Sequence, residues 1–295
     1  MELEFLVVNS FTDKPFGGNP AAVFLRASGL EKNVMQSIAR QMNLVETVFV
    51  SSPEDRRADF RLRYFTPDEE LPVAGHPTVA ACVALVKRGI LNPADGEYVI
   101  ETGKGFVKIA VYNRGGEPSV VMEQPSPLFG EVLGDRGEAA AILGISEGDL
   151  LPELPVAPVD TGLGHLIVPV KSLSALMRIR RNIAPLLDLC GRHGVREVQA
   201  FAFEAYDKSN HLHTRNICPR EGLEDPACGN GCGALGAYLA RYHFQNQQTH
   251  CIRAEQGHIV NMPAVIEIAI FSHGDSILVT VGGTGRLMIE GKLYL

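Results

Sequence analysis

Two apolar helical segments, each preceded by a loop containing proline and glycine, repeat along this chain of 295 residues. The first follows Pro72 and Gly75, and the second follows Pro226 and Gly229, so the two glycines lie 154 residues apart. The same spacing aligns Ala80 with Ala234, Leu85 with Leu239 and Lys87 with Arg241. A repeat of this length is far longer than a solenoid unit. The chain is therefore predicted to contain two similar domains.

Short alternating or β-branched segments surround each helix and predict strands. The strand patterns cover residues 5–8, 21–25, 44–50, 60–64, 98–101, 106–111, 155–159, 166–170, 200–204, 265–271 and 276–281. Amphipathic helices are expected at residues 30–42, 139–143 and 173–190. The segment 79–86 (VAACVALV) is apolar almost all round, which predicts a helix buried on every side. We therefore predict an α+β chain in which an antiparallel sheet wraps one buried helix in each domain.

Composition excludes several classes of protein. The formal net charge is −7, and the densest basic run, residues 178–181, is expected to form one solvated helix face, so no nucleic-acid partner is predicted. No apolar run approaches the ~20 residues of a membrane span. The N-terminal sequence MELEFLVVNS lacks the features of a signal peptide. We expect a cytoplasmic protein whose six cysteines stay reduced.

The two helix starts suggest a chemistry. Unpaired backbone N–H groups and the positive end of the helix dipole make a helix N-terminus a binding site for anions. Two such ends facing each other would hold a small carboxylate-bearing substrate and stabilise an enolate-like charge. The polar residues placed around these ends are His76, Asp225, Cys228 and Asn230. Proton abstraction next to a carboxylate is the reaction that such a site suits.

Glu46 lies in an alternating strand, so that it shares one face with Leu44, Val48 and Val50. If that face points inward, the apolar surroundings would raise the pKa of the carboxyl group, as a general acid or base requires. The alternative is a partnered or edge-facing glutamate.

The other candidates have structural alternatives as well. His76 precedes Pro77 and suits a helix cap, while Asp225 precedes Pro226 and suits a turn. Cys228 at a helix start is either a reactive thiolate or a small buried residue.

Two further motifs are weaker. Residues 231–236 match G-x-G-x-x-G, but a polar loop precedes them where a dinucleotide site needs a strand. We expect these glycines to let a buried helix pack closely on its sheet instead of binding a dinucleotide. The histidines and cysteines between positions 211 and 232 are candidate zinc ligands, namely His211, His213, Cys218, Cys228 and Cys232. Their spacing lacks the tight pairs of a structural zinc site, so no metal is expected.

Six motifs in order resemble the PhzF-like family of the diaminopimelate epimerase superfamily. They are FTDKPFGGNP (residues 11–20), ETVF (46–49), YFTP (64–67), GHPTVA (75–80), TGL with HLIVP (161–163 and 165–169), and EDP (224–226) leading to Gly229. The resemblance covers essentially the whole chain.

The resemblance implies a diaminopimelate-epimerase-like fold of two pseudo-symmetric domains, each a barrel-like sheet around a central helix, with the active site in the cleft between them. We place the domains at residues 1–118 and 119–281, with 282–295 returning to the first. The resemblance also implies a homodimer and cofactor-independent isomerisation.

By the same resemblance, Glu46 moves the proton while His76 and Asp225 bind and polarise the substrate. The backbone N–H groups of Gly75 and Gly229 hold its carboxylate. Asn19, Cys228 and Asn230 are expected to complete the substrate site.

The loop at residues 225–230 departs from the pattern of the phenazine-biosynthesis isomerase of this family, because Asn230 stands where that pattern has a serine. This difference argues against a phenazine precursor as the substrate of this protein. The loop also looks like the cysteine loop of diaminopimelate epimerase, but Ala74 occupies the position equivalent to Cys228. A two-thiol mechanism is therefore not available from these loops. The alternatives are a thiol-type amino-acid epimerase or racemase that uses Cys228, and a non-catalytic ligand-binding protein.

Overall fold

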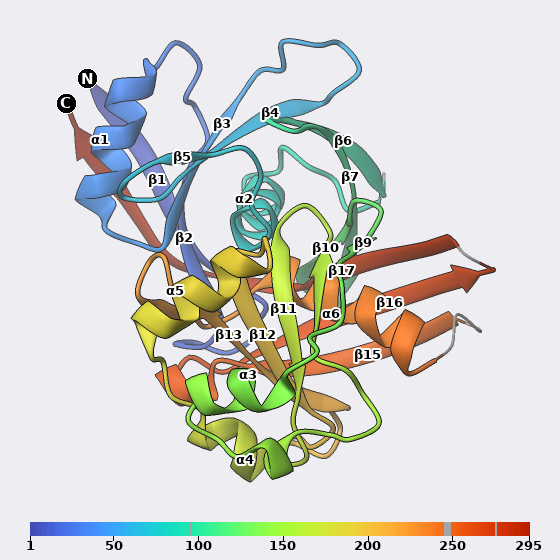
Figure 1. Ribbon diagram of the computed structural model, residues 1–295. Helices are drawn as coiled ribbons and strands as arrows, with labels where there is room; N and C mark the ends of the chain where they lie inside the picture. The colour runs from blue at the N-terminus through green and yellow to red at the C-terminus, as the bar shows by residue number, and fades with distance from the viewer. Residues whose placement is uncertain (95, 245–248, 275) are drawn as a thin grey trace. The chain divides into compact units, whose positions relative to one another are not determined.

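The computed structural model describes residues 1–94, 96–244, 249–274 and 276–295, which group into two compact units. Unit 1 comprises Met1–Glu123 and Gly282–Leu295, and unit 2 comprises Gln124–Val281 (Figure 1). The boundary that the sequence suggested after residue 118 falls within strand β8 (Glu117–Glu123), which pairs along its length with β7.

Unit 1 is a barrel of strands around helix α2 (His76–Lys87). Among the described residues, eight strands close it by pairing in a ring. In ring order they are β17 (Ser276–Tyr294), β1 (Glu2–Ser10), β2 (Asn19–Phe24), β3 (Glu46–Ser51), β4 (Phe60–Phe65), β6 (Glu97–Thr102), β7 (Gly105–Arg114) and β8. The pairs β2–β3 and β4–β6 are parallel. The short strand β5 (Glu70–Leu71) pairs antiparallel with the end of β4.

Helix α2 fills the barrel. Every residue from His76 to Leu85 is buried, and Pro77 occupies the first turn, where its missing N–H costs nothing. The helix contacts β1, β2, β3 and β8 from inside the ring. The predicted burial of this apolar helix on every side is therefore confirmed.

Helix α1 (Lys32–Met42) covers the outer face of the barrel. Its Met35 and Ile38 belong to one apolar cluster with Phe24, Phe49 and Phe65. Phe49 stacks on Phe24 with ring centroids 5.1 Å apart. Because α2 lies on one side of β3 and α1 on the other, residues 47–50 are all buried. The alternation that the sequence suggested for this strand therefore does not separate a solvent-exposed face from a buried one.

Unit 2 places a sheet against helix α6 (Gly229–Tyr242), which contacts β10, β11, β12 and β16. Its strands are β9 (Leu128–Phe129), β10 (Ala157–Asp160), β11 (Gly164–Pro169), β12 (Glu197–Ala202), β13 (Leu212–Cys218), β14 (Leu223–Asp225), β15 (Thr249–Gln256) and β16 (Ala264–His273). Helices α3 (Arg136–Ile142), α4 (Leu173–Arg178) and α5 (Ile183–Arg192) pack against β11 and β12 in a second apolar cluster. Two short 3₁₀ turns are η1 (Glu147–Asp149) and η2 (His258–Val260).

The single helix expected over residues 173–190 is wrong, since the structure breaks it between α4 and α5. The buried guanidinium of Arg215 donates hydrogen bonds to the carbonyls of Leu176 and Ile179 at 2.8 and 3.0 Å. The Arg180 N–H donates to the Leu143 carbonyl, 2.8 Å away, which lies outside the helix. These bonds replace the ones that would continue the helix, so residues 178–181 do not form one helix face.

Glycines on α6 allow the helix to approach its sheet. A Cβ atom on Gly236 would lie 2.7 Å from Ile268 Cγ2 and 2.9 Å from Val279 Cγ1. A Cβ atom on Gly231 would collide with the side-chain oxygen of Gln199. The interpretation of the G-x-G-x-x-G match as a packing feature is confirmed.

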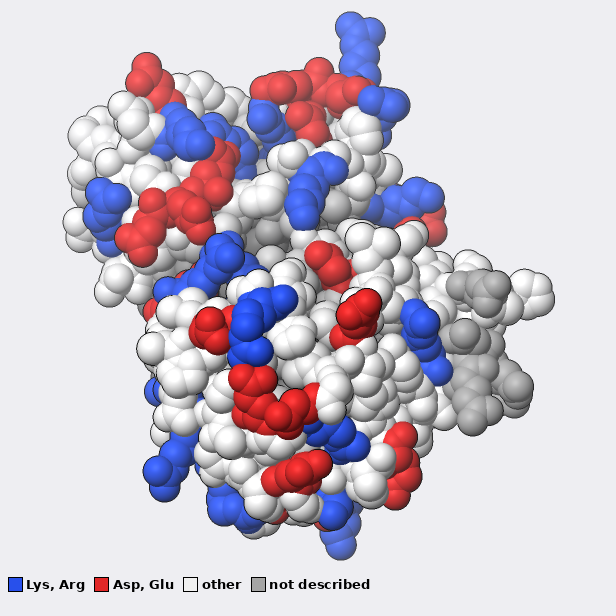
Figure 2. All heavy atoms as spheres, in the orientation of Figure 1, with Lys and Arg blue, Asp and Glu red and all other residues white. Residues whose placement is uncertain are grey.

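Charged side chains of both signs are interspersed on the face shown in Figure 2. Ion pairs among the described residues include Arg63 with Glu70 at 2.7 Å and Lys87 with Glu117 at 2.8 Å. In the part of the chain that the structure describes, no helix has both the length and the apolarity needed to cross a membrane.

The packing at Gly236 gives a stability prediction. Gly236→Ala should lower the free energy of unfolding by about 1–2 kcal/mol, because overpacking costs more than the ~1 kcal/mol that alanine gains in helix propensity. Gly191→Ala in α5 is the control, since a Cβ atom there meets nothing within 4 Å. It should raise the free energy of unfolding by up to about 1 kcal/mol. Urea titration measures both, and a Gly236→Ala protein as stable as Gly191→Ala would contradict the packing argument.

Candidate functional site

Unit 1 holds four of the predicted site residues: Asn19, Glu46, Gly75 and His76. Strand β3 begins at Glu46, which pairs with Ala21 of β2, while α2 begins at His76 immediately after its N-cap Gly75. Glu46 Oε2 lies 3.9 Å from His76 Nδ1. The structure thus brings the predicted proton carrier together with the predicted polarising histidine.

The first turn of α2 is fixed to the barrel by buried hydrogen bonds. Ser10 Oγ donates to the carbonyl of His76 at 2.6 Å. Tyr64 Oη and Thr78 Oγ1 are 2.7 Å apart, and Thr78 Oγ1 also donates to the Ala74 carbonyl. Asn19 is fully buried and pairs with Ser10 between β2 and β1. The end of the helix therefore has a set position relative to the strands around it.

His76 is neutral at physiological pH. Burial lowers the pKa of its imidazole to about 3, although a hydrogen bond with the Pro20 backbone acts in the opposite direction. Its Nε2 atom is buried and finds no hydrogen-bond partner among the described residues. A buried polar nitrogen without a partner is costly, so this atom is suited to a hydrogen bond with a ligand.

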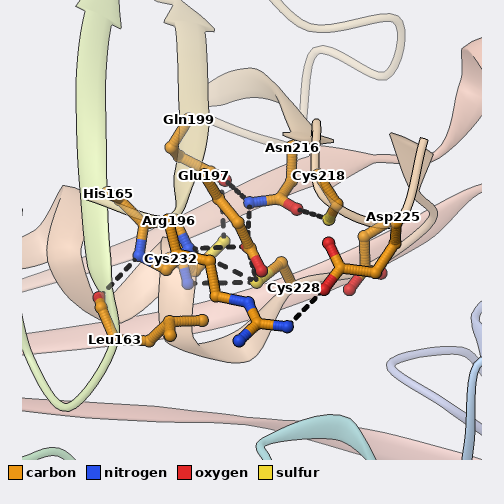
Figure 3. Close-up of polar contacts among 12 residues, drawn as sticks. Leu163, His165, Arg196, Glu197, Gln199, Asn216, Cys218, Asp225, Cys228 and Cys232 are labelled. Atoms are coloured by element: carbon orange, nitrogen blue, oxygen red, sulfur yellow. Dashed lines mark hydrogen bonds and ion pairs between the residues drawn. The ribbon is translucent and has the colours of Figure 1, made fainter. Parts of the chain in front are cut away.

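Unit 2 holds Asp225, Cys228, Gly229 and Asn230 (Figure 3 labels the first two). Asp225 ends β14, and its Oδ1 accepts a hydrogen bond from the Ala227 N–H at 2.8 Å. Gln256 Nε2 donates to the Asp225 carbonyl at 2.7 Å. Burial, together with the negative charge of Glu197, raises the pKa of the Asp225 carboxyl to about 7. This group therefore carries a proton for part of the time at neutral pH.

Cys228 is the N-cap of α6, and its sulfur accepts a hydrogen bond from the Gly231 N–H at 3.2 Å. The same Sγ lies 3.8 Å from His165 Nε2 and 3.8 Å from Glu197 Oε2 (Figure 3). Gly229 opens the helix and is buried, whereas Asn230 is partly exposed. A thiol, an imidazole and a carboxylate therefore meet at the start of α6.

His165 and Glu197 form a buried pair. His165 Nδ1 lies 2.8 Å from the Leu163 carbonyl, and Nε2 lies 3.0 Å from Glu197 Oε2. Both ring nitrogens therefore lie within hydrogen-bond distance of an oxygen atom. Burial raises the pKa of Glu197, but hydrogen bonds with His165 and Asn216 and the charge of His165 together leave it below its usual range.

Of the two alternatives for Cys228, its surroundings favour the small buried residue over the reactive thiolate. Burial and the negative charges of Glu197 and Asp225 hold the pKa of the thiol well above its usual range, and the hydrogen bond from Gly231 does not reverse this. The burial of the sulfur and the two nearby carboxylates raise the thiol pKa by more than the helix N-terminus lowers it. Cys228 thus rests as a neutral thiol.

Polar residues that the sequence analysis did not select support this pair. Asn216 Nδ2 donates to Glu197 Oε2 at 3.1 Å and to Gln199 Oε1 at 2.9 Å, and Cys218 Sγ donates to Asn216 Oδ1 at 3.1 Å. Glu197 and Gln199 stand two residues apart on β12, and their polarity led the sequence analysis to begin that strand at residue 200. Polar residues at i and i+2 in front of a β-branched or aromatic run could have indicated a buried polar strand face.

Potential metal ligands meet in three places among the described residues, with donor atoms within 4.8 Å of one another. The groups are His165 with Glu197 and Cys228, His213 with Glu255 and His258, and Glu197 with Cys218 and Glu221. Of the five residues considered as zinc ligands from the sequence, His213, Cys218 and Cys228 each belong to one of these groups. His211 and Cys232 belong to none of the three.

The raised pKa of Asp225 predicts a pH dependence of stability. Below pH 3.8 the carboxyl is protonated in both the folded and the unfolded state, and between 3.8 and about 7 it ionises more readily in the unfolded chain. The wild-type protein should therefore lose stability relative to Asp225→Asn as pH rises from 4 to 7, by up to about 4 kcal/mol. Denaturant titrations at several pH values measure this difference, and a difference that stays constant with pH would refute the assignment.

Comparison with known proteins supplies the family. The sequence matches the PhzC-PhzF family, described as phenazine biosynthesis-like protein, over residues 8–291. It is 34% identical to the uncharacterized isomerase YfhB of Bacillus subtilis over 96% of each chain. It is 32% identical to the trans-2,3-dihydro-3-hydroxyanthranilate isomerase of Pseudomonas aeruginosa over 99% of each chain.

The fold has a close counterpart among solved structures. The crystal structure of the Bacillus anthracis phenazine biosynthesis protein of the PhzF family superimposes with a TM-score of 0.91 and 30% identity over 100% of both chains. The resemblance found in the six motifs and the predicted α+β fold class are therefore confirmed. This chain belongs to the PhzC-PhzF family of phenazine biosynthesis-like proteins and, with its named relatives, to the enzymes of the isomerase class.

Proposed function

We propose that this protein isomerises a small carboxylate-bearing molecule by moving a proton between carbon atoms, without an organic cofactor, and that Glu46 carries the proton. One observation supports the assignment above the others. The Glu46 carboxylate lies 3.9 Å from the neutral imidazole of His76 at the start of a buried helix. A base, a hydrogen-bonding imidazole and a helix dipole thus occupy one small region.

The proposed reaction conserves atoms and electrons. Glu46 removes a proton from a carbon next to a carbonyl or carboxylate, and the electron pair of the broken C–H bond moves into the adjacent group as an enolate-like charge. The N-terminus of α2 stabilises that charge. His76, whose ring N–H faces the Pro20 carbonyl, polarises the substrate through Nε2, which can accept a hydrogen bond from a protonated substrate oxygen. Glu46 then returns the proton to a different carbon and regains its starting state.

We propose that other residues bind the substrate. Asp225, with a pKa of about 7, can donate a hydrogen bond to a substrate oxygen while it is protonated. The backbone N–H groups at Gly75 and Gly229, each at the start of a buried helix, would hold the carboxylate. Asn19 and Asn230 supply amides near the two helix starts. The resemblance to the PhzF-like family also implies a homodimer, and we propose a cytoplasmic location because the N-terminal sequence lacks signal-peptide features.

Substrate identity within this class is the point at which the chain departs from its Pseudomonas relative. That enzyme is named for a dihydro-hydroxyanthranilate, a ring that bears a carboxylate. The carboxylate is the feature that paired helix starts would recognise, whereas Asn230 changes the loop that follows Asp225. We therefore propose a substrate that bears a carboxylate, and we do not propose the dihydro-hydroxyanthranilate ring itself.

Glu46→Gln should abolish proton exchange. Replacing the carboxylate by an amide removes the base at nearly constant volume, so incorporation of solvent deuterium should fall by at least about 100-fold. The measurement is NMR of a panel of small carboxylates incubated in D₂O. Glu4→Gln, on an exposed position of β1, is the control and should exchange as the wild type does. Saturable carboxylate binding by the wild type, with no exchange at any pH, would instead indicate the non-catalytic ligand-binding alternative.

A second candidate is a thiol-type epimerase or racemase, and one observation favours it. Cys228 Sγ lies 3.8 Å from His165 Nε2 at the start of α6. A base on the opposite face would remove the proton from carbon, and the neutral Cys228 thiol can give its proton to the resulting planar carbanion. The thiolate then regains a proton from the protonated base through solvent. Ala74 stands at the matching position of unit 1, so this route provides one thiol and needs a different base for the opposite face.

Cys228→Ser separates the two candidates. If Glu46 carries the proton, the serine variant should keep most of the deuterium exchange. Iodoacetamide should then not abolish exchange in a Cys251→Ser background, which removes the exposed cysteine. Loss of exchange in Cys228→Ser, with exchange retained in Glu46→Gln, would transfer the chemistry to the thiol.

A further inference from the structure

A second cluster of polar side chains lies in unit 2 and takes no part in the proposed reaction. Strands β13 and β15 run parallel, and their register places His213 directly beside Glu255. His258 follows two residues after β15 ends, in η2. Donor atoms of the three side chains lie within 4.8 Å of one another. His213 and Glu255 are 0% and 2% exposed, whereas His258 is partly exposed.

The turn at Gly257 brings His258 back over β13. Its φ of +84° lies in the left-handed region, and a Cβ atom there would lie 2.6 Å from the Pro226 carbonyl. Only glycine fits this position without a shift of the backbone. The chain therefore reverses tightly enough for a residue after β15 to meet a residue within β13.

The separation of the two imidazoles suits a shared cation. His213 Nε2 lies 3.1 Å from His258 Nδ1. Two nitrogens bound to one metal at about 2.0–2.1 Å are separated by about 2.9–3.4 Å for bond angles between 90° and 109°. The observed separation falls within this range, so a cation would replace the hydrogen bond between the two rings.

Both rings also favour the state that binds metals. Burial lowers the pKa of His213 to about 3, and the neighbouring charges of His258 and Arg215 act in the same direction. Burial lowers the pKa of His258 as well. Neutral imidazole is the form that donates a lone pair to a metal.

Glu255 provides an oriented carboxylate with spare capacity. Its Oε2 accepts the Tyr206 N–H at 2.8 Å, and its Oε1 accepts the Asp207 N–H at 2.7 Å and Asn210 Nδ2 at 2.9 Å. A carboxylate offers about four lone-pair positions, so these three bonds leave one on Oε2. Such support of a ligand by surrounding hydrogen bonds is typical of metal sites.

An aromatic ring borders the cluster. Tyr206 stacks on His258 with centroids 4.5 Å apart and meets His213 edge to face at 5.6 Å. These contacts fix the ring planes, and the tyrosine itself is more than half exposed at the surface. Two nitrogens and one carboxylate oxygen, near solvent, form a donor set that zinc accepts with water in the fourth position.

We propose that His213, His258 and Glu255 bind a divalent transition-metal cation of the zinc type. The site is separate in composition from the group of His165, Glu197 and Cys228. The cation would tie β13 to the turn after β15. Because Gln256 and Gly257 of that turn contact Asp225 and Pro226, it would also steady the loop that leads to α6. Its role is structural support for that loop and not a step of the proposed isomerisation.

Zinc binding by the full chain tests the proposal. The protein is stripped with a chelator in a Cys228→Ser background, which removes the soft ligand of the neighbouring group, and is then dialysed against Zn²⁺ alone. Metal content and the thermal unfolding midpoint are measured. One Zn²⁺ per chain and a raised midpoint are expected. His258→Gln should bind at least about tenfold more weakly and lose the rise in the midpoint.

The controls make the result decisive. His273→Gln, at the exposed end of β16, should bind as the parent does. His258→Gln is the principal variant, because its partly exposed position tolerates an amide better than buried His213 does, and circular dichroism verifies its fold. No saturable zinc binding below ~100 µM, or equal binding by His258→Gln, would overturn the proposal. In either case the two rings would only share a hydrogen bond.

Discussion

Burial of an apolar helix start inside each sheet is the constraint on which the rest of this structure depends. The first turn of a helix carries backbone N–H groups without partners inside the helix, and they cannot be left dry. In unit 2 the Cys228 sulfur accepts the Gly231 N–H. In unit 1 the hydroxyls of Ser10 and Thr78 donate to the carbonyls of His76 and Ala74, which fixes the turn but uses none of its N–H groups. We propose that the arrangement that encloses each helix also leaves its start able to hold an anion.

The two units manage buried polarity in different ways. In unit 1 the histidine beside the carboxylate is kept neutral by desolvation, so the region around Glu46 holds few charges. In unit 2 a histidine and a glutamate form a hydrogen-bonded pair supported by Asn216 and Gln199. Since a buried charge is tolerated when it is paired and hydrogen-bonded, this network also sets the protonation of its neighbours, raising the pKa of Asp225 and of Cys228. The carboxylate of Glu197 therefore acts on the chemistry of two residues with which the sequence analysis did not connect it.

Glycine has separate structural uses in this chain. On α6, Gly231 and Gly236 bring the helix close to its sheet, which fills the interior of unit 2 without cavities at those points. After β15, Gly257 supplies a left-handed turn that returns the chain over β13. The first use is a matter of packing volume and the second of backbone conformation, although both read as a glycine in the sequence.

The sequence by itself determined the parts that depend on local pattern. An apolar run with no polar face requires a helix buried all round, and α2 is such a helix. Alternating and β-branched residues marked most strands, and six motifs identified the family. Glu46, His76, Asp225 and Cys228 could be selected because each stands beside a helix start or within a motif, and the structure places Glu46 next to His76.

Only the tertiary structure decided the features that depend on partners distant along the chain. The break between α4 and α5 follows from Arg215, which lies beyond both helices and takes carbonyls that a helix would use. Glu197 reaches His165 across a parallel strand pair. Burial, together with the negative charges of Glu197 and Asp225, raises the pKa of the Cys228 thiol against the effect of its helix position. His213, Glu255 and His258 meet through a parallel pair of strands and a glycine turn. Local sequence fixes periodicity and caps, but burial and the sum of neighbouring charges are properties of the folded chain.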